Sequence, residues 1–590
     1  MLAGEQPLAT DPRREGVAAL IVALVFVACL ATTMGYIVTY ASAIPLSDDY
    51  TIVRMLTQGG VTEWLWALHN EHRCPLPKLL LWAIVAPTHS LRLAMLCHAT
   101  LLALPPLGMV WVARRLRGTV SIADAFFPLI WLQLGNYFNL LTAFDVVMAV
   151  SASLRAGLFL LLISQATSRW SIGRCALIGI CLIGLPLSGG AGVLWLVVPA
   201  LCLAVVALRQ GARTPATGVL IVSVLAALGV LGAYLAGYEA PEGHTERGSP
   251  LEVALTASRF LSMGMGGSSK GHWVWIAGVL LVLLPAVVLG LRSSLPGKRA
   301  WILVFLAADL CLALGIGWGR AGNGPSAGLA ERYVTLVLPF LSTLFLAAVL
   351  VRPTWLSRGV QLVLLGGCLA LVPENLDRAL TYGRKRREVS QVVYAEVSQQ
   401  WSPQQVAFRH ARNLEGGRRP ALAAMFEGMR EIRFAPYDRV DDGGASGPAV
   451  KPPYSMFGAE PLEVTSSEKT RVSRLGLLPV LLVHADGTLR FDVPADATTV
   501  EGTCGLHPIA LASGRCDGIV LSAEVRTGDA QDGHAWQPLF RVVLEPGEKR
   551  KGAFRHPLPE GATEVVFRVG NQAGRTTEMD WSFWTGIRFR

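Results

Sequence analysis

Apolar stretches about 20 residues long follow one another as far as residue 374, and short polar connectors separate them. Because a helix rises about 1.5 Å per residue, about 20 apolar residues cross the core of a bilayer. The pattern therefore predicts about eleven transmembrane helices. Their expected positions are 17–40, 91–113, 120–135, 144–164, 172–187, 190–208, 215–237, 273–291, 300–318, 333–351 and 358–374.

The pattern changes after the last apolar stretch. Residues 376–440 have the amphipathic spacing of membrane-proximal helices, and residues 441–478 read as a linker rich in Gly, Pro and Asp. From residue 479 onward, polar and apolar positions alternate in short runs, which is typical of strands. The sequence thus predicts a mainly α polytopic membrane domain over residues 1–375 and an all-β, jelly-roll-like sandwich over residues 479–590.

Composition and charge placement support this division. Of the 590 residues, 52% are hydrophobic and only 16% are charged, and the mean hydropathy is +0.45, whereas soluble domains carry roughly 25% charged residues. The formal net charge is +10, but alternate connectors hold the basic clusters, as in "ARRLRG" and "LRSSLPGKR". This favours the positive-inside rule over nucleic-acid binding. We expect a cytoplasmic N-terminus, a multi-pass protein of the inner or plasma membrane, and an extracytoplasmic C-terminal domain.

Two polar clusters then fall on the same, outer side of the predicted bundle. A carboxylate can act there as a general base. A guanidinium group can bind two oxygens of one phosphate through two hydrogen bonds. The clusters consist of Asp48, Asp49, Glu71, His72 and Arg73 in the first loop, and Arg320, Arg332 and Tyr333 in "GRAGNGPSAGLAERY".

With these residues the chain resembles the GT-C class of integral-membrane glycosyltransferases, which includes protein O-mannosyltransferases and aminoarabinose transferases of lipid A. Enzymes of this class carry an acidic pair in the first extracytoplasmic loop and use polyprenyl-phosphate sugars. The segment "LHNEHRCPLPKLL" and the later Gly-Arg and Arg-Tyr loop are similar to those of an uncharacterised bacterial subgroup. This chain departs from the subgroup in "TAFDVV", where Asp145 stands in place of the usual Gln.

The resemblance implies an inverting hexosyl- or pentosyltransferase that moves a sugar from a polyprenyl-phosphate donor to an extracytoplasmic glycan, lipid or protein acceptor. Asp48 is the expected general base and Asp49 a support that orients the loop or the acceptor. The other members of the two clusters are expected to bind substrate. No metal-ligand spacing occurs, the need for a divalent cation stays open, and the expected partners are substrates and membrane lipid rather than nucleic acid.

Other interpretations of the same residues remain. A transporter or flippase of lipid-linked sugars, or a non-catalytic glycan receptor, would also carry apolar helices. Ser47 and Asp48 suit a helix cap, and Glu71 with Arg73 suits a surface ion pair. Arg155, Asp145 and Asp309 fall within or near expected spans, where Arg155 either pairs with one of the two aspartates or the charges serve a function. No role is assigned to any of the three.

The C-terminal sandwich is similar to carbohydrate-binding jelly rolls. Trp536, Trp581 and Trp584 either stack on sugar rings or fill the core, and strand aromatics more often fill a core. Cys504 and Cys516 either form a disulfide, which an oxidising compartment allows, or remain buried thiols.

Overall fold

A computed structural model of the chain describes most of the residues between Pro12 and Arg590. The described residues are 12–165, 170–210, 214–238, 248–291, 296–324, 326–398, 403, 406–407, 410, 414, 419–437, 457, 461–466, 471–475, 478–506, 518–528, 536–545, 552–570 and 581–590. The chain divides into two compact units, Met1–Val440 and Asp441–Arg590.

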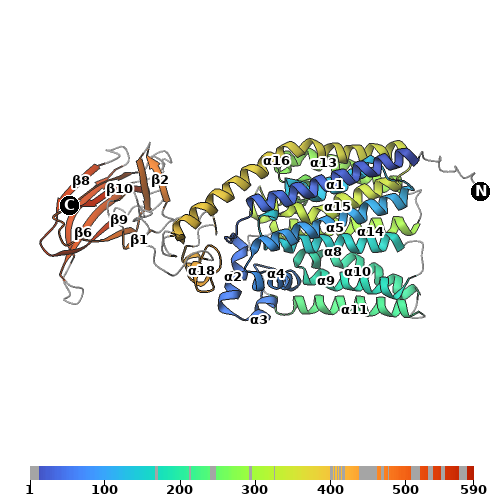
Figure 1. Ribbon diagram of the computed structural model, residues 1–590, viewed down its shortest axis with the longest axis horizontal. Coiled ribbons are helices and arrows are strands. Elements are labelled where there is room, and N and C mark those ends of the chain that lie inside the picture. Colours follow the sequence, from blue (N-terminus) through green and yellow to red (C-terminus); the bar gives the residue numbers. More distant parts are fainter. Residues whose placement is uncertain are drawn as a thin grey trace, which may run out of the picture. The chain divides into compact units, whose positions relative to one another are not determined.

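Long apolar helices form a bundle in the first unit (Figure 1). Within the described ranges, nine of them are long and apolar enough to cross a membrane, which confirms the predicted polytopic membrane domain. These are α1 (Pro12–Tyr40), α5 (Leu91–Arg117), α8 (Val146–Gln165), α10 (Gly190–Gln210), α11 (Pro215–Leu235), α13 (Ser269–Gly290), α14 (Pro296–Arg320), α15 (Val334–Leu350) and α16 (Thr354–Ser398). A shorter apolar helix, α9 (Ile172–Leu187), packs against α11.

Side-chain caps fix where several of these helices begin. The hydroxyl oxygens of Ser90 and Thr214 accept hydrogen bonds from backbone N–H groups in the first turns of α5 and α11. Such a cap satisfies one of the N–H groups that have no partner within the helix. At the other end of α5, Gly118 has a φ of +92°, a conformation that suits glycine.

The predicted continuous span at 120–135 is wrong, because this segment is interrupted. It consists of η2 (Ile122–Ala125), α6 (Phe126–Leu132), η3 (Leu134–Asn136) and α7 (Tyr137–Leu140). Helix α6 ends before Gln133. The Gln133 side chain donates a hydrogen bond to the carbonyl of Met265 and accepts one from the amide of Asn375. Surrounding helices bury the segment. Polar groups at the interruption can therefore form hydrogen bonds with other parts of the protein, which lipid could not provide.

The interrupted segment nevertheless runs from one end of the bundle to the other. At its start, Asp124 accepts two hydrogen bonds, of 2.9 and 3.0 Å, from Arg117 at the end of α5. At its finish, Asn139 donates to Thr335 at the start of α15. Counted with α9, the described part of the chain passes along the bundle eleven times, as many as predicted.

Short helices gather at the end of the bundle that lies opposite the start of α1 (Figure 1). They are α2 (Tyr50–Gln58), α3 (Val61–Trp66), α4 (Pro75–Thr88), α12 (Pro250–Ser262) and α18 (Arg419–Glu431). The helix α4 is not among those predicted from the sequence. Its end lies near the end of α1, because Arg92, just beyond it, donates to the carbonyl of Ala41. We call this the loop end of the bundle.

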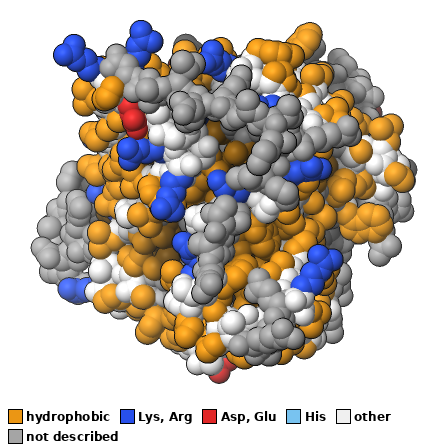
Figure 2. Space-filling view, turned by 90° about the vertical axis from the view of Figure 1, so that its right-hand side faces the viewer, with side chains coloured by type: hydrophobic (Ala, Val, Ile, Leu, Met, Phe, Trp, Pro, Cys, Tyr) orange, Lys and Arg blue, Asp and Glu red, His pale blue; other side chains and the backbone are white. Residues whose placement is uncertain are grey.

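The other end of the bundle, which we call the basic end, is rich in Lys and Arg (Figure 2). Glu15 near the start of α1 pairs with Arg114 near the end of α5 at 3.1 Å, which places both helix ends there. The basic residues in the first or last turns of the helices that end here, or in the adjoining connectors, include Arg114, Arg115, Arg117, Arg174, Arg209, Lys298, Arg299, Arg352 and Arg358.

A buried ion pair joins two helices inside the bundle. Arg155 on α8 lies 3.7 Å from Asp309 on α14, and both side chains are almost fully buried. The indole N–H of Trp195 on α10 donates to the same carboxylate at 2.8 Å, and Arg155 also donates to the carbonyl of Leu336. The structural pairing that the sequence left open is the one found.

The helix α16 continues well beyond the expected end of the last span. It runs without a break to Ser398, across the boundary expected at residues 375 and 376. Its apolar half lies in the bundle, while its second half carries the charged residues of "YGRKRREVS". A helix can continue from lipid into water because its backbone hydrogen bonds are internal.

The second unit contains two five-stranded antiparallel sheets that face each other. The strand orders are β1-β4-β9-β6-β7 and β2-β3-β10-β5-β8. Three strands begin before residue 479, inside the stretch expected to be a linker, and the third of them begins at its last residue. The strands are β1 (Glu463–Thr465), β2 (Arg471–Leu475), β3 (Leu478–His484), β4 (Gly487–Asp492), β5 (Thr499–Leu506), β6 (Ile519–Thr527), β7 (Gln537–Leu544), β8 (Gly552–Pro557), β9 (Ala562–Gly570) and β10 (Trp581–Phe589).

Aromatic side chains fill the space between the two sheets. Trp584 on β10 is fully buried against Phe567 on β9, with ring centroids 5.3 Å apart. Trp584 is therefore a core residue, and Trp536 is half-buried. The side chain of Trp581 lies outside the described residues, as does Cys516, so the disulfide with the buried Cys504 stays a prediction.

Candidate functional site

The loop between α1 and α4 folds back over the loop end of the bundle. It contains η1 (Ser47–Asp49), α2 and α3. A tight turn follows, in which His69 and His72 exchange backbone hydrogen bonds of 2.7 and 3.0 Å. Asn70 in the turn has a φ of +52°, a left-handed conformation that Asn tolerates better than most residues. The turn holds the side chains from His69 to His72 close together.

Asp49 is buried beneath this loop and fixes its path. One carboxylate oxygen accepts from the backbone N–H of Phe144 at 2.8 Å, and the other accepts from that of Leu46 at 3.2 Å. Burial raises the pKa of Asp49 to about 6, although these two hydrogen bonds act in the opposite direction. Asp49 is not among the residues that line the cavity beside Asp48, and its two backbone contacts are those of a loop anchor.

Asp48, the neighbouring acid, lines a cavity and is a third exposed. Its Oδ1 lies 3.5 Å from Nε2 of His69, whose ring packs on Phe144. Burial raises the pKa of Asp48, but the close contact with His69 and the charge of Arg332 bring it below its ordinary value. Asp48 is therefore an ionised, accessible carboxylate at neutral pH.

Glu71 joins the loop to the end of α14. Its carboxylate pairs with the Arg320 guanidinium and lies 3.4 Å from Nε2 of His72. The His72 ring lies so close to Gly190 that a Cβ on this glycine would be 2.5 Å from Nδ1. Glycine at the start of α10 is thus required for the turn and the helix to meet. The helix α9 ends at Leu187 and α10 begins at Gly190, so the two are separate helices.

Arg332 and Tyr333 lie across the cavity from the loop, in η7 (Glu331–Tyr333). Tyr333 is buried against Phe260, with ring centroids 5.5 Å apart. The Arg332 guanidinium lies 5.7 Å above the Tyr333 ring, and within the described residues it has no ion-pair partner. Asn139 holds the backbone by donating to the Arg332 carbonyl at 3.1 Å. Arg332 can therefore receive an anion.

Asp145, to which the sequence analysis gave no role, also lines the cavity. It lies just before α8 and is only 4% exposed, and its Oδ2 has no hydrogen-bond partner. Burial and the charge of Asp48 raise its pKa well above the ordinary value, which Arg332 partly offsets. The hydroxyl of Ser151, one of the next cavity-lining residues on α8, is also buried without a partner. Both groups can bond to a polar ligand.

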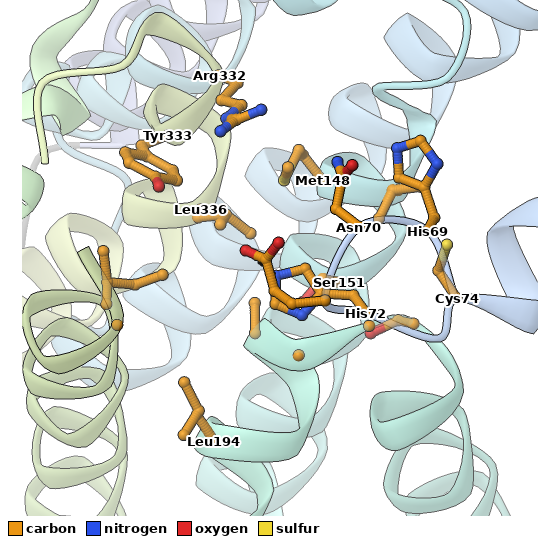
Figure 3. Close-up of a pocket in the computed structure, with 18 of the residues that line it drawn as sticks. His69, Asn70, His72, Cys74, Met148, Ser151, Leu194, Arg332, Tyr333 and Leu336 are labelled. Carbon is orange, nitrogen blue, oxygen red and sulfur yellow. Dashed lines mark ion pairs between the residues drawn. The ribbon is translucent and has the colours of Figure 1, made fainter. Parts of the chain in front are cut away.

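The cavity has a volume of about 240 Å³. Figure 3 shows Arg332 and Tyr333 on one side and His69, Asn70 and His72 on the other. Apolar side chains of α8, α10, α14 and α15 form another part of its wall. These include Met148, Leu194, Ile316 and Leu336. Of the eight predicted site residues, the cavity is lined by Asp48, Glu71, His72, Arg320, Arg332 and Tyr333.

Arg73 is the predicted substrate-binding residue that lies elsewhere. Its guanidinium donates to the backbone carbonyls of Trp66, Tyr234 and Ala236 at 2.9, 3.3 and 3.3 Å. These carbonyls belong to the end of α3 and the end of α11, where helix carbonyls lack internal partners. Arg73 therefore ties the loop to α11 and is not among the residues that line the cavity.

A buried lysine gives the loop a second attachment. Lys78 on α4 donates to the carbonyls of Trp64 and Ala67 at 2.7 and 2.8 Å. The sequence analysis missed Lys78 and His69. His69 lies inside the quoted "LHNEHRC" segment, but no spacing rule links it to Asp48. Among the described residues, no three His, Cys, Asp or Glu side chains gather as a metal site would require.

The fold and the cavity define a multi-pass membrane protein with a charged, half-apolar cavity at one end of its bundle and a separate β-sandwich. No family model and no curated protein matches the sequence. Among solved structures, the chain is similar to ArnT from Cupriavidus metallidurans bound to undecaprenyl phosphate. The identity is 17%, the TM-score is 0.38, and the match covers 70% of this chain and 75% of that one.

Two further solved structures are similar to this chain, one over its whole length and one over about a fifth of it. Arabinosyltransferase EmbB from Mycobacterium smegmatis matches at 14% identity and a TM-score of 0.30, over 100% of this chain and 66% of that one. The CBM51-2 and INT domains of ZmpB from Clostridium perfringens match at 12% identity and a TM-score of 0.18, over 22% of this chain and 30% of that one.

Proposed function

We propose that the chain is a membrane glycosyltransferase that moves a sugar from a polyprenyl-phosphate donor to an extracytoplasmic acceptor. The observation that supports this most is the pairing, across one cavity, of an accessible carboxylate, Asp48, with a guanidinium, Arg332, that has no ion-pair partner among the described residues. Such a pair suits a reaction in which a hydroxyl loses a proton while a phosphate departs.

In the proposed reaction, Asp48 accepts the proton of the acceptor hydroxyl as its oxygen attacks the anomeric carbon of the sugar. The bond between that carbon and the phosphate oxygen breaks, and both of its electrons leave with the lipid phosphate. Arg332 stabilises the negative charge that gathers on the phosphate. Attack from the side opposite to the phosphate inverts the anomeric centre. Glycosylated acceptor, lipid phosphate and a protonated Asp48 are the products.

The remaining cavity residues have supporting roles in this proposal. Arg320 is already engaged by Glu71, so it contributes charge and holds the loop in place rather than binding phosphate alone. His69 orients the Asp48 carboxylate. Asp145 and Ser151 offer hydrogen bonds to sugar hydroxyls, and the apolar walls accept the first isoprene units of the lipid.

The distribution of Lys and Arg between the two ends of the bundle indicates on which side of the membrane the acceptor binds. The positive-inside rule puts the basic end of the bundle in the cytoplasm, so the loop end and its cavity face outward. With eleven passes, the second unit follows on the same outer side. A carbohydrate-binding role for the sandwich would then place it near extracytoplasmic glycans, and this role remains a proposal.

Thiol labelling tests the orientation. Glu63→Cys on α3 and Arg358→Cys on α16 introduce exposed thiols at opposite ends of the bundle. In intact cells, a membrane-impermeant maleimide should label Glu63→Cys, whereas Arg358→Cys should be labelled only after the membrane is opened. The reverse pattern would place the cavity in the cytoplasm and contradict an extracytoplasmic acceptor.

Donor binding tests the function itself. Arg332→Gln should weaken the binding of a synthetic polyprenyl-phosphate sugar about tenfold or more, because a hydrogen bond to a charged group contributes about 1.5–3 kcal/mol. Affinity is measured on the purified chain, together with the release of lipid phosphate. Arg358→Gln, which removes an equal charge at the basic end, is the control. If both variants bind the donor equally well, Arg332 is structural and the proposed donor site is lost.

A further inference from the structure

A second cavity, of about 500 Å³, opens at the basic end of the bundle. It lies where α5 and α8 end, whereas both helices begin at the loop end. Helices α5, α8, α9 and α14 form it. The residues that line it are Val112, Arg115, Leu116, Ile163, Ser164, Arg174 and Lys298. None of them belongs to the cavity proposed for catalysis.

The rim of this cavity is strongly cationic. Arg115, Arg174 and Lys298 come from three different helices, and no acidic residue is among the described lining residues. The Arg115 guanidinium lies 4.5 Å above the ring of Trp111. Within the described ranges, neither Arg115 nor Lys298 has a carboxylate at ion-pair distance. Arg115 and Lys298 are like charges at the rim of one cavity, so an anion between them would be stabilised.

The floor of the cavity has the opposite character. Val112 and Ile163 are buried, and Leu116 is half-buried beside them. Apolar side chains below a basic rim suit a ligand with an anionic head and a hydrocarbon chain. A phosphate group suits this rim, because an arginine guanidinium can donate two hydrogen bonds to one phosphate. The ammonium group of Lys298 adds a further positive charge.

We propose that this cavity binds the phosphate group of an anionic membrane lipid at the basic end of the bundle. The proposal does not depend on the sugar-transfer reaction, because it uses other residues at the other end of the bundle. Basic side chains near a membrane surface contribute about 1 kcal/mol each toward anionic lipid, which corresponds to about fivefold in affinity. Two of them together should therefore account for about 25-fold.

Native mass spectrometry of the purified full chain in detergent tests the proposal. Phosphatidylglycerol should bind more tightly than the zwitterionic phosphatidylcholine to the unchanged protein. Arg115→Gln and Lys298→Gln should each weaken phosphatidylglycerol binding about fivefold, and the double variant about 25-fold. Arg358→Gln, which removes a charge from the same end but outside the cavity, should leave binding unchanged.

Three results would overturn the proposal. Equal binding of the two lipids would show that the cavity does not select an anionic head. An equal loss in Arg358→Gln would show a diffuse surface charge in place of a site. Displacement of the lipid by an equal concentration of inorganic phosphate would show that a free phosphate compound is the ligand. The comparison of lipids needs no substitution, so the outcome does not depend on how any variant folds.

Discussion

Asp48→Asn is expected to lower sugar transfer by about 10²–10⁴-fold, the usual loss when a general base is removed. Asparagine keeps the volume of the side chain and removes its basicity, while Arg332 and the cavity walls stay unchanged. Donor affinity and the melting temperature should therefore stay close to those of the unchanged protein. The measurement is transfer from a synthetic polyprenyl-phosphate sugar by purified variants, with donor affinity measured separately.

Asp49→Asn is the matched control, because the two acids are neighbours with different environments. The introduced amide would present one N–H toward a backbone N–H that now donates to a carboxylate. A buried donor without a partner costs about 1–3 kcal/mol, so this variant should lose stability more than it loses transfer per folded molecule. Near-normal transfer by Asp48→Asn together with its loss in folded Asp49→Asn would reverse the two roles.

Arg155→Met is expected to destabilise the bundle by about 3–5 kcal/mol, the usual cost of leaving the partner of a buried ion pair uncompensated. The substitution keeps an apolar side chain of similar length but leaves the Asp309 carboxylate with the Trp195 indole alone. Thermal unfolding of the purified protein in detergent measures the effect. Arg209→Met, at the exposed end of α10, should change stability little.

The double variant Arg155→Met/Asp309→Asn separates a charge effect from a packing effect. Asparagine can still accept the hydrogen bond of Trp195 but carries no charge. The double variant should therefore be more stable than Arg155→Met alone. If it is less stable, the loss comes from the volume and contacts of the arginine, and the ion pair is not what holds α8 against α14.

Hydrophobic patterning alone determined the class of this protein. Apolar runs of spanning length reflect the cost of placing polar groups in lipid, and basic clusters in alternate connectors reflect the preference of Lys and Arg for the cytoplasmic side. Both effects act on each segment by itself. The same reasoning gave eleven passes and a separate β-sandwich. Some of the residues that line the cavity could be predicted from the sequence, because loops on one side of a membrane share one surface. Asp48, Arg332 and Tyr333 were chosen on this ground.

Only the tertiary structure decided which side chains meet. Asp48 and Asp49 are adjacent in sequence, but the turn at η1 directs one to the cavity and the other to the backbone of Phe144. Arg73 follows His72 yet bonds to α11, and Asp145 enters the cavity from α8. The break at Gln133 also depends on a distant Asn375. Such outcomes follow from contacts between segments far apart in the chain, whereas periodicity and spacing report only on a segment and the solvent around it.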